Sequence, residues 1–251
     1  MSGTLALIGS GNVGGAIAKL AVDAGWTVVL SNSRGPETLA ELVASLGDRA
    51  TAATAEEAVA KSDLVVVSVP LLAYRNLPAD QLAGKIVIDA INYYPQRDGD
   101  IAELESGELT ESGLLQRALP GARVVKAFNN IVFRHLADLP RPSGSPDRAT
   151  LPIAGDDESA KAEVTRLLDD LGFDALDYGT LADSWRSERD MPAYVAPYHE
   201  PAPEGLDLQE YAGWVYLTAA AAPASAEKIS ALLASATRET TAHEAVDISR
   251  F

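Results

Sequence analysis

The chain has 251 residues, of which 47% are hydrophobic and 22% are charged, and its formal net charge is −16. This composition is typical of a soluble globular protein, and an acidic chain without a basic stripe disfavours nucleic acids and anionic membranes as partners. The absence of cysteine excludes disulfides, thiolate metal sites and thiol catalysis. With no secretory signal at Met1 and no apolar run of about 20 residues, we expect a cytoplasmic protein.

Short β-branched runs alternate with amphipathic stretches over the first 180 residues. Strands are predicted at Thr4–Ile8, Thr27–Leu30, Ala50–Ala53, Leu64–Val69, Ile86–Ala90, Arg123–Phe128, Leu151–Ala154 and Asp174–Tyr178. Helices are predicted at Gly14–Ala24, Pro36–Leu46, Ala55–Lys61 and Asp157–Leu171. Because helices separate the strands, the sequence favours the α/β class, with a doubly wound and mainly parallel sheet of the Rossmann type.

The character of the sequence changes after Gly179. Residues 183–205 mix proline, tyrosine, tryptophan and charge without periodicity, which predicts a long irregular loop. Two helices are expected to follow, over Leu206–Ala221 and Ala224–Thr240. We therefore divide the chain into a Rossmann-like domain, residues 1–180, and a loop and helical extension, residues 181–251. The extension either covers the sheet as a cap or forms the interface of a homodimer.

A glycine-rich segment, GSGNVG, follows the first predicted strand and opens the first predicted helix. A glycine-rich turn occurs in many α/β proteins, but this context is the one that a dinucleotide site requires. Gly9 allows a tight turn, Gly11 lets the backbone approach a pyrophosphate, and Gly14 permits close packing of helix and strand. Free N–H groups at the start of the helix suit phosphates. The residues expected to bind are Gly9, Ser10, Gly11, Asn12, Val13 and Gly14.

The end of the second strand indicates which dinucleotide binds. A site for NAD would place an aspartate or glutamate there, yet the chain has Ser31, Asn32, Ser33 and Arg34, and the first carboxylate is Glu37. Hydroxyls, an amide and a guanidinium suit the 2′-phosphate of NADP(H). The alternative is a polar turn with an arginine that faces solvent. We expect NADP(H), so residues 1–180 become an NADP-binding domain.

Three further strand ends should surround the reacting ring, because ligands lie over the carboxyl ends of the strands in such sheets. Val69 and Pro70 are small and apolar and can flank the nicotinamide ribose. Amide side chains follow the next two strands at Asn92, Asn129 and Asn130. Each asparagine is suited equally to binding the ligand and to forming a turn.

The sequence contains no clear arrangement for proton transfer. Of the three histidines, His135, His199 and His243, only His135 is near a predicted strand end, and the surface of a helix suits it as well. There is no H-E-x-x-H motif, no Lys-Tyr pair at four-residue spacing, and no metal-ligand spacing. Catalytic residues are therefore left unassigned and no metal site is predicted. Reduction of a carbonyl usually needs a placed acid, whereas a flavin-like acceptor largely carries its own chemistry.

Five segments together resemble the NADPH-dependent coenzyme F420 reductase family. They are the glycine segment GSGNVGGAIA, then SNSR, VSVP, IDAIN and GARVVKAFNNI, and the similarity spans residues 3–179. The resemblance implies a Rossmann-like fold in which NADPH passes a hydride to a 5-deazaflavin. Carried over by position, it implies that Ser31, Ser33 and Arg34 hold the 2′-phosphate. It also implies that Val69, Pro70, Asn92 and Ala127 line the nicotinamide.

The segment Ser184–Pro203 departs from this family, because it is longer and more aromatic, with Trp185, Tyr194, Tyr198 and His199. It could admit a different acceptor, and the loop YYPQRDG at residues 93–99 is also unusual. Both segments suit ordinary packing at a loop or an interface equally well.

Three functions therefore stay open. The first is an oxidoreductase that transfers a hydride between NADPH and coenzyme F420 or a similar ring acceptor. Cations for the phosphate and glutamate tail of F420 would come from Arg75, Arg97, Lys126 and Arg134. The second is NADPH-dependent reduction of a small carbonyl, imine or flavin, with a proton from Tyr93, Tyr94, Tyr194 or His199. The third is a non-enzymatic NADP(H) sensor whose acidic C-terminal helices face a partner.

Overall fold

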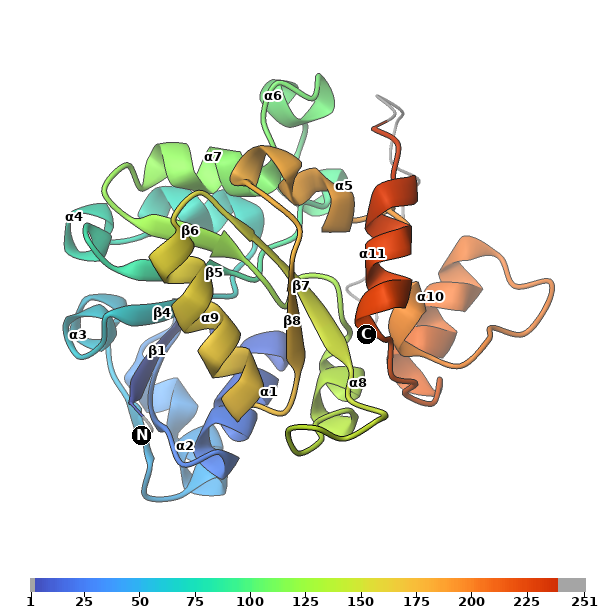
Figure 1. Cartoon of the computed structure of the whole chain (residues 1–251). Helices are drawn as coiled ribbons and strands as arrows, with labels where there is room; N and C mark the ends of the chain where they lie inside the picture. The colour runs from blue at the N-terminus through green and yellow to red at the C-terminus, as the bar shows by residue number, and fades with distance from the viewer. Residues whose placement is uncertain (1–2, 239–251) are drawn as a thin grey trace.

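The computed structural model describes residues 3–238, which form one twisted sheet with helices on both faces (Figure 1). The sheet has eight strands in the order β3-β2-β1-β4-β5-β6-β7-β8. In chain order the strands are β1 (Thr4–Ile8), β2 (Thr27–Ser31), β3 (Ala50–Ala52), β4 (Leu64–Val67), β5 (Ile86–Asp89), β6 (Arg123–Lys126), β7 (Thr150–Gly155) and β8 (Asp174–Asp177). All eight predicted strands are present, and the doubly wound α/β class is confirmed.

The strands from β3 to β6 pair in parallel, and β7 pairs with β8 in parallel, but β6 and β7 are antiparallel. The predicted strand over Arg123–Phe128 ends earlier, at Lys126, because Phe128 adopts a left-handed backbone conformation with φ of 63°. The sheet is therefore mainly parallel, with one reversal that separates β7 and β8 from the other strands.

The helices are α1 (Asn12–Asp23), α2 (Ala40–Leu46), α3 (Ala55–Ala60), α4 (Ala79–Leu82), α5 (Pro95–Asp98), α6 (Ala102–Glu105), α7 (Glu111–Ala118), α8 (Phe133–Asp138), α9 (Glu158–Asp170), α10 (Leu208–Leu217) and α11 (Ala226–Ser235). Short 3-10 helices lie at Pro36–Leu39, Leu71–Asn76, Leu181–Ser187 and Ala196–Tyr198. Sequence patterns did not predict α7 and α8, because six to eight residues are too few to show a clear period. Within residues 3–238 no helix combines the length and apolar character needed to cross a bilayer.

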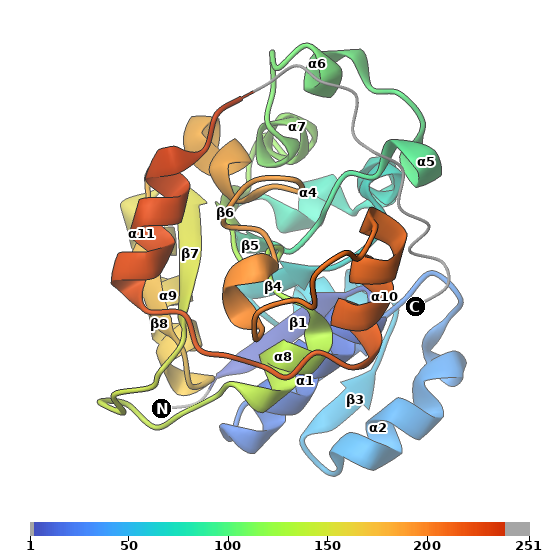
Figure 2. The ribbon, with the colours of Figure 1, turned by 90° about the vertical axis from the view of Figure 1, so that its right-hand side faces the viewer.

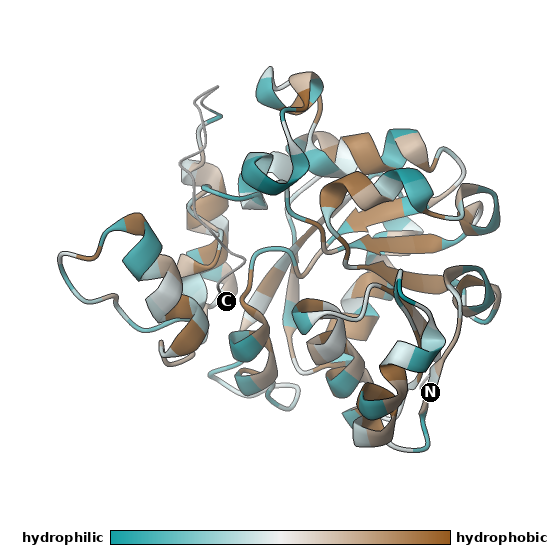
Figure 3. Ribbon diagram, turned by 180° about the vertical axis from the view of Figure 1, so that it is seen from behind, coloured by the Kyte–Doolittle hydropathy of each residue, from teal (hydrophilic) through white to brown (hydrophobic). Residues whose placement is uncertain are grey.

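Alternate residues of each strand face opposite layers, so the sheet separates two apolar cores. Leu5 and Leu7 of β1 lie in the core that contains α1, α9 and α11, whereas Ala6 and Ile8 lie in the core that contains α3 and α7. The central strands are hydrophobic along their length (Figure 3). This is the pattern expected of strands buried on both faces.

The C-terminal segment is irregular, as predicted, but it is not an exposed loop. Ser187, Ala193, Val195 and Tyr198 are buried. Helix α11 runs beside β7 and β8 (Figure 2), with Ile229 and Leu233 buried against the sheet. The two predicted helices are shorter than expected. The end of the second, at residues 239–240, and His243 lie outside the described residues.

Candidate active site

The glycine loop between β1 and α1 has the geometry of a dinucleotide-binding turn. Gly9 has a φ of +98°, and a Cβ atom there would lie 2.1 Å from the Ser68 carbonyl oxygen. A Cβ atom on Gly14 would lie 2.1 Å from the Gly9 carbonyl oxygen. At Gly11, in contrast, no described atom lies within 4 Å of that position. Gly9 and Gly14 therefore permit the tight turn and its close packing, and the backbone at Gly11 is open to a ligand.

Helix α1 begins directly at this opening. Its N-cap residue is Gly11, and no side chain among the described residues caps its first N–H groups. A cleft of about 400 Å³, which we call the glycine-loop cleft, extends from Gly9–Gly11 past Ser33 and Arg34 to Val69 and Pro70. Uncapped N–H groups at a helix start are a binding site for phosphate.

The four polar residues Ser31 to Arg34, at the end of β2 and in the turn after it, differ in their roles. Ser31 is fully buried: its hydroxyl donates to the Leu7 carbonyl (2.9 Å), and its own carbonyl accepts from the Gly9 N–H (2.9 Å). It therefore supports the glycine loop instead of holding a 2′-phosphate, which corrects the expectation for its side chain. Asn32 accepts from the Arg34 N–H (3.0 Å), which shapes the turn, and it also lines the cleft. Ser33 and Arg34 are exposed and line the cleft.

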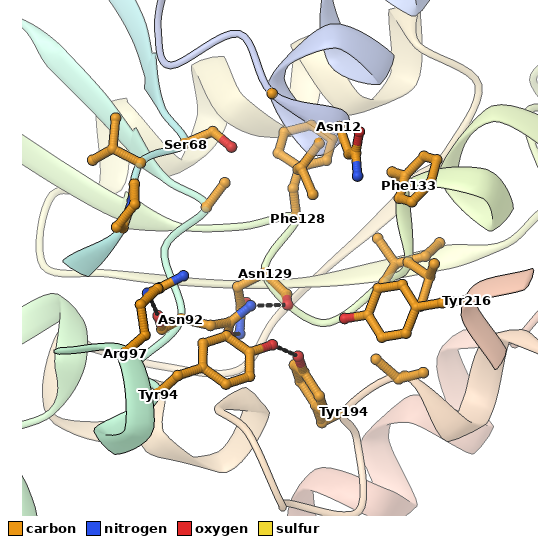
Figure 4. A pocket seen from close by; sticks show the side chains of 18 residues that line it. Asn12, Ser68, Asn92, Tyr94, Arg97, Phe128, Asn129, Phe133, Tyr194 and Tyr216 are labelled. Carbon is orange, nitrogen blue, oxygen red and sulfur yellow. Dashed lines mark hydrogen bonds between the residues drawn. The ribbon is translucent and has the colours of Figure 1, made fainter. Parts of the chain in front are cut away.

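A second cavity, of about 270 Å³, continues from the glycine-loop cleft, and we call it the tyrosine cavity (Figure 4). The cleft and the cavity share Gly11, Ser68, Val69 and Pro70. Other side chains that line the cavity are Asn12, Val13, Asn92, Tyr94, Arg97, Phe128, Asn129, Phe133, Tyr194 and Tyr216. Two compartments that meet at Gly11 fit the two halves of a dinucleotide with its pyrophosphate between them, so the described residues suit NADP(H).

The turns after β5 and β6 hold this cavity together. The Asn92 side chain donates to the Asn129 carbonyl (2.7 Å), and the Asn129 side chain donates to the Ser187 carbonyl (2.7 Å). Asn130 does not line the cavity, because its side chain donates to the Ala193 carbonyl (2.9 Å) and anchors the C-terminal segment. Ala127, expected beside the nicotinamide, is buried in the core, and its neighbour Phe128 lines the cavity instead.

Three tyrosine hydroxyls meet at the far side of the tyrosine cavity, and we call Tyr94, Tyr194 and Tyr216 the tyrosine wall (Figure 4). The Tyr94 and Tyr194 hydroxyls are 2.8 Å apart. Burial raises the pKa of Tyr194 and Tyr216 well above the ordinary value, and the neighbouring Tyr94 raises both further. These phenols are therefore protonated at neutral pH and can donate hydrogen bonds.

Of the four proton donors considered from the sequence, the structure brings only Tyr94 and Tyr194 to the cavity. The Tyr93 hydroxyl donates to Glu105 (2.8 Å) outside it, and His199 Nε2 lies 2.7 Å from the Tyr211 hydroxyl. His135 is buried, and burial lowers the pKa of its imidazole, so it packs as a neutral side chain. Tyr216 was missed because the aromatic residues of its helix suited an ordinary packing face.

The four cations proposed for a deazaflavin tail are not grouped. Lys126 is completely buried and contacts Glu111 (2.9 Å) and Asp89 (3.5 Å), so it cannot meet a ligand, which corrects that expectation. Arg97 lines the tyrosine cavity but is paired with Asp98 (2.7 Å). Arg75 is exposed beside Tyr74, and Arg134 donates to the Tyr216 carbonyl (3.3 Å).

The buried charges around Lys126 form a network with Asp89 and Glu111. Burial opposes the charge of Lys126, but Asp89 and Glu111 outweigh that effect and raise the pKa of the ammonium group. Glu188 accepts from the Glu111 N–H (2.8 Å). Burial, together with the nearby Glu111 carboxylate, raises the pKa of Glu188 to about 8. Strand ends, α7 and the C-terminal segment are thus joined by one network of charges.

Comparison with known proteins gives one family match and several similar proteins. Residues 4–93 match the family described as NADP oxidoreductase, coenzyme F420-dependent. The metalloreductase STEAP3 of Rattus norvegicus is 34% identical over 197 residues, which are 76% of this chain and 38% of that protein. The chain spans less than half the length of the curated relatives it matches.

Two solved structures are similar over most of the chain. A hypothetical protein from Sinorhizobium meliloti has a TM-score of 0.66 and 29% identity, and the match covers 77% of this chain and 93% of that one. A candidate F420-dependent NADP reductase from an Arthrobacter species has a TM-score of 0.59 and 26% identity, and the match covers 72% of this chain and 86% of that one. The comparisons confirm the resemblance seen in the sequence, the Rossmann-like fold, and NADP(H) as the cofactor.

Proposed function

From the premise that residues 4–93 belong to the family of coenzyme F420-dependent NADP oxidoreductases, we propose that this NADP-dependent oxidoreductase reduces a small carbonyl or imine compound. The observation that carries the proposal is the tyrosine wall. It places protonated hydroxyls in a cavity that continues directly from the glycine-loop cleft. Reduction of a carbonyl or an imine usually needs a placed acid, whereas a flavin-like acceptor largely carries its own chemistry.

Different residues of the described structure are suited to different parts of NADPH. Gly11 and the start of α1 would receive the pyrophosphate, and Ser33 and Arg34 would contact the 2′-phosphate. Val69 and Pro70 lead into the tyrosine cavity, where Asn92 supplies an amide for the nicotinamide end. When bound there, the reduced nicotinamide supplies a hydride to the acceptor carbon.

The tyrosine wall then supplies the proton that the acceptor takes up as it is reduced. A Tyr94 or Tyr194 hydroxyl donates a hydrogen bond to the acceptor oxygen or nitrogen and transfers its proton as the carbon is reduced. The neighbouring hydroxyl, 2.8 Å away, returns a proton to the phenolate that is formed. The Arg97 guanidinium, which is paired with Asp98, lies 5.0 Å from the centre of the Tyr94 ring. The product is an alcohol or an amine, and the proton is finally replaced from solvent.

Hydride transfer to coenzyme F420 is the second candidate. The matched family and the Arthrobacter structure favour it, since both are described by that coenzyme. The burial of Lys126 and the pairing of Arg97 with Asp98 weigh against a site for its charged tail.

The test is to mix the purified protein with NADPH and, separately, a ketone, a cyclic imine and oxidised F420, and to follow absorbance. We expect NADPH consumption with the ketone or imine, and a much slower reaction with NADH. Bleaching of F420 without turnover of either small acceptor would establish the second candidate instead. Binding of NADPH and NADP+ with no turnover would indicate a sensor.

A further inference from the structure

A third cavity, of about 250 Å³, lies behind the tyrosine wall, and we call it the Arg189 cavity. It shares Tyr94, Tyr194, Val195 and Tyr216 with the tyrosine cavity, so the same side chains face both spaces. The rest of its lining is mostly apolar and includes Met191, Ala196, Leu208, Ala212 and Val215. An apolar space that borders a set of candidate proton donors is suited to the body of an acceptor.

The walls of these two cavities contain strained backbone. Within residues 3–238 three residues other than glycine have a positive φ: Phe128 (63°), Asp190 (68°) and Val195 (59°). Each of them lines one or both cavities. Such a conformation is unfavourable, above all for a β-branched residue such as valine, and strain of this kind gathers at binding sites. The Val195 N–H donates to the Asn130 carbonyl (2.9 Å), which helps to hold the strained turn.

Arg189 is the cation at the edge of the Arg189 cavity. Its side chain is 4% exposed, and its Nε and Nη2 atoms have no hydrogen-bond partner among the described residues. The nearest carboxylate is Asp190, 3.3 Å from Nη2 and itself half exposed, and the guanidinium lies 5.1 Å from the centre of the Tyr94 ring. Nε and Nη2 form the edge by which an arginine binds a carboxylate with two parallel bonds. Buried polar groups normally have hydrogen-bond partners, and within residues 3–238 this edge has only the ion pair with Asp190, so it can receive a ligand.

We propose that the Arg189 cavity binds the acceptor through a carboxylate held by Arg189 and an apolar body packed on Met191 and Val215. The acceptor is then an apolar oxo acid or imino acid whose reducible group extends past the tyrosine wall into the tyrosine cavity, an inference that rests on the proposed function. A carboxylate, with a single charge, fits better than a phosphate, because the one guanidinium of Arg189 is already opposed by the negative Asp190, and a second negative charge on the ligand would add to the repulsion. Nε and Nη2 are covered in this structure, so binding of the carboxylate requires the guanidinium to turn toward the cavity.

The test measures binding, and it uses phenylacetate and its uncharged amide, phenylacetamide, as probes in the presence of NADP+. In calorimetry we expect the protein to bind phenylacetate at least about tenfold more tightly than the amide. Arg189→Met should abolish this preference. Arg186→Met is the matched control, because that arginine donates to the Leu233 carbonyl and lines neither cavity, so the preference should persist.

Equal binding of the two probes to the unmodified protein, or a preference that survives Arg189→Met, would overturn the proposal. Should Arg189→Met fail to fold, Leu208→Trp replaces it, because Leu208 lines the cavity yet is 39% exposed and tolerates a larger side chain. Loss of phenylacetate binding in that variant supports the proposal, and unchanged binding contradicts it. NADPH binding, and NADPH consumption with a ketone or a cyclic imine, are measured in parallel. A carboxylate preference without turnover would refute the proposed function but leave the Arg189 site in place.

Discussion

The glycine-loop cleft and the tyrosine cavity adjoin each other but are built in different ways. The cleft is made by backbone at Gly9–Gly11 and by the short turn at Ser33 and Arg34, so its parts are local in the sequence. The cavity is made by side chains from the ends of β5 and β6, from the segment around Tyr194 and from α10. A site made of backbone turns leaves a local motif, whereas a site assembled from distant side chains leaves none.

The largest expected effect tests the claim that the cleft is made of backbone. A side chain at Gly11 meets no described atom within 4 Å, so Gly11→Val should fold normally but block the pyrophosphate. We expect NADPH affinity to fall by about 100-fold, or ~2.7 kcal/mol, with an unchanged melting temperature. Gly9→Ala is the contrasting variant and should lower the melting temperature, because its Cβ would lie 2.1 Å from the Ser68 carbonyl oxygen. Normal NADPH binding by Gly11→Val would contradict the placement of the pyrophosphate.

The next effect concerns the side chains of the cavity. Replacing both hydroxyls, with Tyr94→Phe and Tyr194→Phe together, should lower kcat by about 100-fold, because a placed acid contributes at least that much. Each single variant should lose less, since the neighbouring hydroxyl lies 2.8 Å away and can substitute. NADPH affinity, measured by fluorescence titration, should not change. An unaltered kcat in the double variant would remove the tyrosine wall from the reaction.

The same contrast explains what the sequence could predict. The bounds of β1 agree with the prediction, and the glycine roles follow from the motif, because both depend on neighbouring residues. The burial of Ser31 could not be predicted, since its hydroxyl bonds to Leu7 on the adjacent strand. Lys126 was wrongly expected to contact the charged tail of a deazaflavin. Its partner Glu111 lies on α7, a helix too short to show a period in the sequence. Tyr216 lies on α10, and it reaches the cavity because of the path that the chain takes between β8 and α10. No local sequence pattern predicts that path.

A smaller effect tests the selection of NADPH over NADH. Arg34→Ala removes an exposed guanidinium that lines the cleft, so NADPH affinity should fall by about tenfold, or ~1.4 kcal/mol, while NADH affinity stays constant. Arg75→Ala removes an exposed arginine that does not line the cleft and should change neither. An equal loss for both cofactors in Arg34→Ala would mean that this arginine does not meet the 2′-phosphate.

The smallest effect is a pH dependence of stability that originates behind the cavity. The pKa of Glu188 is raised to about 8, above its ordinary value of 4.5, so the folded state holds this proton more tightly than the unfolded state does. Its contribution to stability is complete below pH 4.5 and is lost as the pH rises through about 8. Relative to Glu188→Gln, the protein should therefore lose a few degrees of melting temperature between pH 5 and pH 9, by calorimetry. A constant difference between the two proteins would show that Glu188 is ionised when folded.

The packing of α11 has a consequence for how the molecule unfolds. Ala224, Ile229 and Leu233 belong to the same apolar core as Leu5 of β1 and Ile17 of α1, and the Thr150 N–H of β7 donates to the Ala224 carbonyl (2.8 Å). Elements that share one core melt together, so heat or denaturant should remove the C-terminal segment and the sheet in a single cooperative transition. Helix α11 and the sheet that carries the cofactor cleft are thus gained and lost as one unit.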